Sequence, residues 1–209
     1  MKQPSNVLQA NAFTVEDIVL DAESLSREKQ FQSFTIGMRI PKDYFIAKGV
    51  GECDITVHAG SFHQALRDAG IERYNIITYS SIMPAIAREV PRPKELIHGA
   101  VMETIMACAN VERGVRATAG IIYGWLYSRK TKQKYGGLVC EYNGSLSEAE
   151  ASEQMRASLQ ALYTNGFESE FELRGERVIT KSFIPKKKYG TALVAICFTN
   201  YVYPVLGVR

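Results

Sequence analysis

The sequence has no long run of apolar residues. Its longest apolar stretches lie near Ala117–Tyr127 and Ala192–Phe198. Both are far shorter than the roughly 20 residues of a membrane-spanning helix, so we expect no membrane contact. Lys2, Glu16 and Asp17 come before any long apolar segment, and no secretory signal is visible.

The sequence is also poor in paired cysteine motifs and in excess charge. Its four cysteines, Cys53, Cys108, Cys140 and Cys197, are widely spaced and form no CxxC. This spacing favours reduced thiols and predicts a cytoplasmic protein. Lys and Arg number 25 against 22 Asp and Glu, giving a net charge of +3. That excess is too small to indicate a nucleic-acid partner.

Two short basic segments and one glycine pair do not change this view. Arg129–Lys134 and Lys186–Lys188 lie beside Gly or Pro between expected strands, where solvated charges are common. Gly49-Val50-Gly51 lacks the third glycine of a dinucleotide-binding loop, so we interpret it as an ordinary loop.

The residues that are present predict a folded α+β protein. Apolar residues make up 46% of the chain and charged residues 22%, which is typical of a globular domain. We expect an N-terminal extension over 1–30, with a helix at Val15–Gln30, and a single domain over 31–209. The strand-like segments are Phe31–Ala47, Tyr74–Tyr79, Ala100–Ala109, Ala117–Tyr127, Leu138–Tyr142, Phe171–Leu173, Val178–Phe183 and Ala192–Val202. Arg88–Glu95 holds two prolines and predicts a loop.

Two helices interrupt these strands. Ser61 as N-cap and Gly70 as a stop predict a short helix at Phe62–Ala69. A capping box at Ser147 and Glu150 opens a second helix, which Asn165-Gly166 ends. Its apolar positions recur with helical spacing at Ala151, Met155, Leu159 and Leu162. Because the helices show no βαβ rhythm, they should stack on largely antiparallel sheet.

Four possible metal ligands lie close together at Cys53, Asp54, His58 and His63. Their spacing matches no common zinc pattern, so we expect a polar loop leading into the first helix and no metal.

Ser80-Ser81 ends an apolar strand abruptly, just before Ile82-Met83-Pro84. Such a pair can be a simple turn. It can also react: the Ser81 hydroxyl attacks the Ser80 carbonyl, and the resulting ester eliminates to dehydroalanine. Hydrolysis then releases ammonia and leaves a pyruvoyl group. That ketone can form a Schiff base with a substrate amine and accept the electrons left by a departing carboxylate.

The surrounding motifs favour this second interpretation. They are Gly51-Glu52, Phe62-His63-Gln64-Ala65-Leu66, Ala69-Gly70-Ile71, Asn75-Ile76, Ser80-Ser81-Ile82-Met83-Pro84, His98-Gly99-Ala100-Val101, Gly137-Leu138-Val139-Cys140-Glu141-Tyr142, the helix Ser147–Leu162, Gly166-Phe167 and the strand Gly190–Tyr201. Together they resemble the proenzymes of pyruvoyl-dependent arginine decarboxylase over about Ile40–Tyr201. Residues 1–30 lie outside the resemblance.

The resemblance implies an αββα sandwich and a cofactor made from the chain itself. Self-cleavage between Ser80 and Ser81 would give a β chain of 1–80 and an α chain of 81–209 that begins with the pyruvoyl group. Three αβ units would form a trimer with active sites at the subunit interfaces. The implied reaction converts arginine, a small-molecule amino-acid substrate, to agmatine and CO₂.

The resemblance also implies roles for individual residues. Glu141 matches the catalytic proton donor, a role that suits a carboxyl group with a raised pKa. Asn75 matches a residue associated with self-processing, and Ser80 would line the substrate pocket. Their ordinary alternatives are a strand-end carboxylate for Glu141 and a turn residue for Asn75.

One position departs from the family pattern. The family has an Asp that holds the substrate guanidinium where this chain has His63. An ion pair of that kind contributes about 1.5–3 kcal/mol, so its loss matters for arginine. Three interpretations of His63 remain open: a polar residue at a helix start, the mark of a different amino-acid substrate, or a change in which Asp54 or Glu52 takes over the role. A further alternative is an uncleaved trimeric scaffold without enzyme activity.

Overall fold

The computed structural model describes residues 34–94 and 97–208, so the extension over 1–30 and the helix expected at Val15–Gln30 lie outside the described residues. The chain divides into two compact units. In the described part, the smaller unit is the antiparallel pair β1 (Phe34–Ile36) and β13 (Val205–Val208). The larger unit spans Met38–Pro204 and contains everything that follows.

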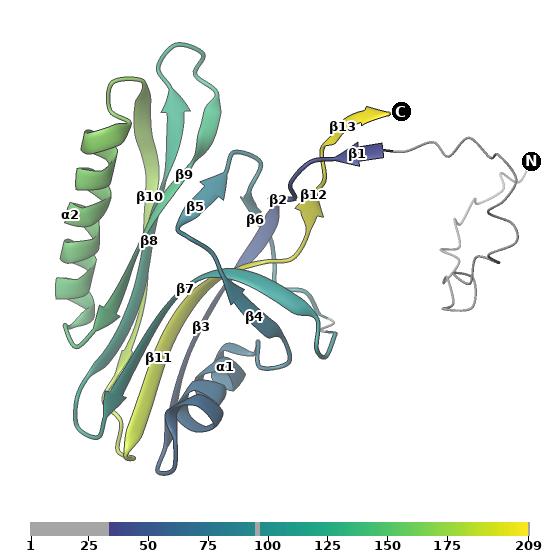
Figure 1. Cartoon of the computed structure of the whole chain (residues 1–209). Helices are drawn as coiled ribbons and strands as arrows, with labels where there is room; N and C mark the ends of the chain where they lie inside the picture. The colour runs from purple at the N-terminus through teal and green to yellow at the C-terminus, as the bar shows by residue number, and fades with distance from the viewer. Residues whose placement is uncertain (1–33, 95–96, 209) are drawn as a thin grey trace, which may run out of the picture. The chain divides into compact units, whose positions relative to one another are not determined.

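The larger unit contains two main sheets and two α-helices, which confirms the α+β class (Figure 1). The five-stranded sheet has the order β4-β7-β11-β3-β6, and the four-stranded sheet has the order β10-β8-β9-β5. The first consists of β3 (Asp43–Cys53), β4 (Asn75–Thr78), β6 (Arg88–Glu89), β7 (Val101–Glu112) and β11 (Tyr189–Phe198). The second consists of β5 (Ile82–Pro84), β8 (Ala117–Ser128), β9 (Lys134–Gly144) and β10 (Phe171–Phe183). A small pair, β2 (Ile40–Pro41) and β12 (Tyr201–Val202), completes the strands.

Most of the strand pairs are antiparallel, and the two exceptions involve short edge strands. β4 runs parallel to β7, and β6 runs parallel to β3. Parallel pairing needs a crossover connection, and the segment from β4 to β7 supplies one that also carries β5 and β6. This crossover brings the chain from one sheet to the other at Ser80-Ser81.

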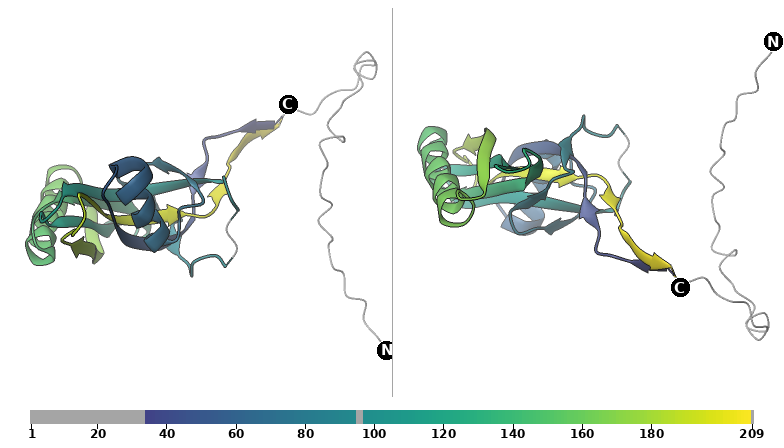
Figure 2. Two further views of the ribbon diagram at one scale, coloured as in Figure 1. Left: turned by 90° about the horizontal axis from the view of Figure 1, so that it is seen from below. Right: turned by 90° about the horizontal axis from the view of Figure 1, so that it is seen from above.

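Buried side chains form three clusters, one for each packing interface. The first cluster takes residues from both sheets, including Ile105 and Val194 of one and Ile121 and Val139 of the other. The second packs α1 (His63–Ala69) against β3 and β11 through residues such as Leu66. The third packs α2 (Glu148–Gly166) against β8 and β9. Figure 2 shows that each helix lies on its own sheet.

The second helix forms largely as its sequence predicts. Ser147 accepts a hydrogen bond from the backbone of Glu150, and the Glu150 side chain accepts one from the Ser147 backbone, so the capping box is confirmed. Ala151, Met155 and Leu159 are buried. The prediction for Leu162 was wrong: it is 40% exposed, and Tyr163 takes the buried position. Because a helix has 3.6 residues per turn, Tyr163 lies four residues after the buried Leu159 on the face that packs against the sheet.

The expected loop at Gly49-Val50-Gly51 is wrong, because β3 continues through it to Cys53. A β-carbon on Gly49 would collide with the carbonyl oxygen of Ala65, and one on Gly51 with that of Ser61. The glycines are therefore needed for the helix to approach the strand, which is one of the uses of glycine within a strand.

The expected N-cap at Ser61 is also wrong. A single π-helical segment, Val57–Phe62, runs directly into α1, so Ser61 lies within helical structure. Its buried hydroxyl lies 2.8 Å from Oγ1 of Thr191 on β11. The predicted stop at Gly70 is confirmed by its left-handed backbone, with φ of 63°.

Two further boundaries differ from the expectation. The expected strands Phe171–Leu173 and Val178–Phe183 are one strand, β10, with a register shift between Arg174 and Arg177. The predicted loop at Arg88–Glu95 begins with the two-residue strand β6. In the described residues, no helix is both long and apolar enough to cross a membrane.

Candidate active site

The Ser80-Ser81 peptide bond lies where the chain passes from one sheet to the other. Before it, the backbone N–H of Tyr79 donates to the carbonyl of Thr104 on β7 at 2.7 Å. After it, the carbonyl of Ser81 accepts from the N–H of Val139 on β9 at 3.2 Å. Ser80 is exposed between these two anchors. The bond is thus held on one side by the five-stranded sheet and on the other by the four-stranded sheet.

Ser81 is placed directly against Glu141. Its hydroxyl donates to Oε1 of Glu141 at 2.5 Å, and both side chains are half-buried. The contact depends on β5, which pairs with β9 so that Ile82 lies opposite Leu138. Gly137 permits this pairing, because a β-carbon there would press on the side chains of Met83 and Trp125.

This arrangement suits a group built from Ser81. A charged carboxylate makes a strong hydrogen bond to a hydroxyl and fixes its direction. Atoms derived from the Ser81 side chain stay within reach of Glu141 as long as β5 keeps its pairing with β9. Glu141 is therefore positioned to hold or deliver a proton at residue 81.

Asn75 lies apart from this pair within the chain. It begins β4, and its side-chain amide donates to the carbonyl of Gly99 at 2.8 Å. β4 runs from Asn75 to Thr78, about 10 Å at about 3.3 Å per residue, and Ser80 lies two residues beyond its end. The structure of one chain does not bring Asn75 to the bond between Ser80 and Ser81.

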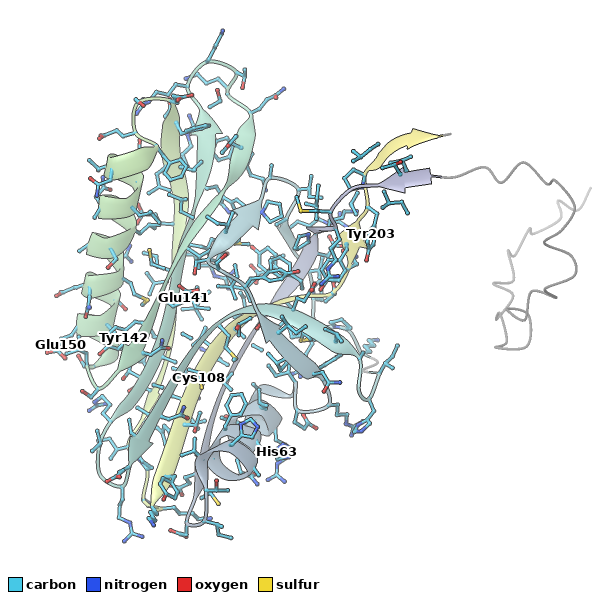
Figure 3. The ribbon with its side chains drawn as sticks, in the orientation of Figure 1. His63, Cys108, Glu141, Tyr142, Glu150 and Tyr203 are labelled. Atoms are coloured by element: carbon cyan, nitrogen blue, oxygen red, sulfur yellow. The ribbon has the colours of Figure 1, made fainter. Side chains whose placement is uncertain are left out.

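His63 is also separate from the Ser81–Glu141 pair. It is exposed at the start of α1, on the outer side of the five-stranded sheet, whereas Glu141 belongs to β9 of the other sheet. Figure 3 shows the two side chains on these different elements. The two side chains therefore do not meet within one chain.

The two acids considered as replacements for the family aspartate already have partners. Glu52 accepts hydrogen bonds from the backbone N–H of Lys186 at 2.7 Å and of Lys187 at 3.3 Å. Asp54 accepts from the N–H of Lys188 at 3.0 Å and pairs with Arg113 at 3.5 Å. Both acids fasten the start of β11 to the end of β3. This local role weakens their case as guanidinium ligands.

The four possible metal ligands do not converge. His58 stacks on Phe62 with ring centroids 5.8 Å apart, and Asp54 is engaged as described above. Backbone N–H groups of Ile55 and Thr56 lower the pKa of Cys53. Within residues 34–94 and 97–208, no group of three or more His, Cys, Asp or Glu side chains is placed to hold a metal ion.

A cavity of about 770 Å³ lies away from Ser81, between β3, α1 and the connection into β11. Charged side chains of both signs line it, including Glu52, Arg67, Asp68 and Lys187. The cavity borders the helix that carries His63, and its lining includes neither Ser81 nor Glu141.

One further group beside Ser80 was not predicted from the sequence. Tyr79 donates from its hydroxyl to Glu103 at 2.5 Å, and Glu103 is also paired with Arg39. The only signal available was a carboxylate within the apolar strand around Val101–Ala109. Its partners lie 24 and 64 residues away, and only the fold brings them together.

The chain is similar in sequence to known proteins. Residues 43–203 match the family model described as pyruvoyl-dependent arginine decarboxylase. Pyruvoyl-dependent arginine decarboxylase 2 of Archaeoglobus fulgidus is 32% identical over 61% of this chain and 80% of that protein. Pyruvoyl-dependent arginine decarboxylase AaxB of Chlamydia abortus and that of Chlamydia caviae are each 31% identical, over 79% of this chain and 94% of theirs.

The matched region includes the Ser80-Ser81 crossing, β9 with Glu141 and the helix that carries His63. It covers most of the chain, and the residues around the crossing fit a cofactor made from Ser81. The chain therefore belongs to the pyruvoyl-dependent arginine decarboxylase family, a family of carboxy-lyases that use a covalently bound pyruvoyl group.

Proposed function

We propose that this protein cleaves itself between Ser80 and Ser81 and then decarboxylates arginine to agmatine and CO₂. The observation that carries the proposal is the 2.5 Å hydrogen bond from the Ser81 hydroxyl to Glu141, at a bond held between two sheets. The names of the similar proteins support arginine as the substrate.

Cleavage proceeds in steps that need only water. The Ser81 oxygen adds to the carbonyl carbon of Ser80, the peptide C–N bond breaks, and the hydroxyl proton passes to the freed nitrogen of Ser81. The ester then loses the α-proton of residue 81 and the carboxylate of Ser80, which leaves dehydroalanine. Its imine tautomer takes up water and releases ammonia. The products are a β chain of 1–80 and an α chain of 81–209.

The pyruvoyl group supplies an electrophilic carbonyl and an electron sink for decarboxylation. Glu141 holds a proton close to residue 81 and returns it to the substrate carbon that has lost its carboxylate. Ser80 remains beside this position as the new end of the β chain and lines the pocket. Partial burial of Glu141 limits the access of water to its carboxyl group, which strengthens its interaction with the reacting atoms.

We further propose that the four layers are stacked in the order α1, five-stranded sheet, four-stranded sheet, α2, which is an αββα sandwich. The three separate core clusters support this order. We also propose a trimer of αβ units with sites at the interfaces. Support comes from His63 and Asn75, which lie away from Glu141 within one chain. The free state of the four cysteines in the described residues supports a reducing, cytoplasmic location.

The identity of residue 63 favours a second candidate substrate. A neutral histidine offers one weak hydrogen bond to a guanidinium, and a protonated one repels it. The same chemistry on an amino acid without a cationic side chain is therefore the alternative. An uncleaved trimeric scaffold is the remaining alternative, and self-cleavage distinguishes it from both enzymes.

The test is CO₂ release by the purified, self-processed protein from arginine and from a panel of other amino acids. The proposal predicts that arginine is the best substrate and that Ser81→Ala is inactive on all of them. Release from a different amino acid in preference to arginine would establish the second candidate. No release from any amino acid by a fully cleaved protein would refute both.

A further inference from the structure

Glu103 is a buried carboxylate with two partners, and one of them adjoins the cleavage bond. Its side chain is 3% exposed on β7, facing the interior between the sheets. The Tyr79 hydroxyl donates to its Oε2 at 2.5 Å, and Nε of Arg39 donates to the same oxygen at 3.2 Å. A second Arg39 nitrogen pairs with Oε1. A buried carboxylate is costly unless it is paired in this way.

The network holds Tyr79 at three points. Its backbone N–H donates to Thr104, its ring packs against Phe198 with centroids 5.7 Å apart, and its hydroxyl donates to Glu103. Arg39 is itself fixed, because its guanidinium lies over the ring of Tyr201 at 5.4 Å. Tyr79 is therefore a rigid position immediately before Ser80.

Ser81, on the other side of Ser80, is also held at several points. Its carbonyl is bonded to Val139, its hydroxyl to Glu141, and the following residues pair with β9. Only Ser80 lies between the two fixed points. The position of its carbonyl carbon relative to the Ser81 hydroxyl is thus set by Tyr79 from one side and by Glu141 from the other.

We propose that Tyr79, Glu103 and Arg39 are positioning residues for self-cleavage. They hold the carbonyl carbon of Ser80 where the Ser81 oxygen can add to it, in the step that turns the amide into an ester. The inference rests on the proposed cleavage between Ser80 and Ser81. None of the three residues supplies or accepts a proton in the reaction: their effect is to exclude unproductive orientations, which can be worth large factors in rate.

The experiment compares Tyr79→Phe with Tyr163→Phe. Tyr163 is a matched control, because its hydroxyl donates to the carbonyl of Phe171 at 2.9 Å on the far side of the four-stranded sheet. Each full-length precursor is followed on gels after synthesis, and its melting temperature is measured. Each is also incubated with hydroxylamine, which cuts an ester at residue 80 but not an amide.

We expect Tyr79→Phe to slow cleavage at least about tenfold, with and without hydroxylamine, because the ester forms slowly. Tyr163→Phe should cleave at the wild-type rate, even if its melting temperature falls as much or more. Wild-type cleavage by Tyr79→Phe would overturn the inference. So would a slow variant that hydroxylamine restores to the wild-type rate, because its defect would follow ester formation. A wild-type protein that never cleaves would instead refute the proposed function.

Discussion

The hydroxyl of Ser81 donates a hydrogen bond to Oε1 of Glu141 over 2.5 Å, although 60 residues separate the two in the sequence. The pairing of β5 with β9 produces this contact. The peptide bond before Ser81 is held by backbone hydrogen bonds to both sheets, through Tyr79 on one side and Ser81 on the other. In the proposed function, formation of the cofactor at Ser81 and its later chemistry therefore share one location. Variants that separate the two stages are the most informative.

Glu141→Gln should allow cleavage and prevent efficient turnover. The amide oxygen of Gln can still accept the Ser81 hydrogen bond, so the attacking hydroxyl stays oriented. An amide cannot return a proton, so turnover should fall by about 10²–10⁴-fold, the usual contribution of general acid catalysis. The measurement is kcat on the isolated cleaved variant. Unchanged turnover would remove Glu141 from the mechanism.

His63→Asp should improve the use of arginine if residue 63 reads the substrate side chain. A carboxylate facing a guanidinium contributes about 1.5–3 kcal/mol, so binding should tighten about ten- to a hundredfold. His63 is exposed on α1, so a charged aspartate at this position remains solvated. The fold should therefore be intact.

The control for this variant is Gln64→Asp, which adds the same charge one position along the helix. It should leave the KM for arginine unchanged. If wild type uses arginine efficiently and His63→Asp makes no difference, residue 63 does not contact the side chain. If wild type prefers another amino acid, His63→Asp should reduce that activity and create turnover of arginine.

Gly51→Ala should destabilise the fold. The new methyl group would collide with the carbonyl oxygen of Ser61 and the backbone nitrogen of Ala65. Backbone atoms of a packed helix cannot move aside cheaply, so we expect a loss of about 1–3 kcal/mol. Gly166→Ala is the control: its added methyl group meets nothing within 4 Å, and it replaces a helical glycine. The urea concentration at the unfolding midpoint should fall for Gly51→Ala. For Gly166→Ala it should rise or change clearly less.

Asp43 should make stability depend on pH in the acid range. Hydrogen bonds from Arg88 and Asn200 lower its pKa from an ordinary value of 3.8 to about 2. Because the folded pKa is the lower one, this stabilisation is complete above pH 3.8 and is lost as the pH falls towards 2. The melting temperature of Asp43→Asn should change less with pH than that of wild type across this window. The exposed Glu153→Gln should follow wild type, and an equally steep Asp43→Asn curve would contradict the assignment.

Local signals were enough to predict much of the fold. The capping box at Ser147 and Glu150, and the stop at Gly70, act through neighbouring backbone atoms, and both are confirmed. Gly49 and Gly51 were wrongly predicted to form a loop. They are glycines because a helix outside the strand packs closely against it at these positions. Ser61 was misread because its hydroxyl meets Thr191, 130 residues away.

Some parts of the candidate site were predicted from the sequence and others were not. The motifs around Ser81 and Glu141 led to both residues, and their contact appears in the structure. The distance of His63 and Asn75 from that pair follows from the layers of the fold, which no local pattern encodes. The Tyr79–Glu103 bond joins adjacent parallel strands, so only the register of β4 on β7 could reveal it.

The central claim is that the protein makes its own cofactor at Ser81, and mass spectrometry of the purified protein tests it directly. We predict two fragments, one ending at Ser80 and one beginning at residue 81. The second should be lighter by one ammonia than the product of simple hydrolysis, and Ser81→Ala should remain a single chain. A wild-type protein that stays intact at 209 residues, or a Ser81→Ala variant that is cut at the same bond, would contradict it.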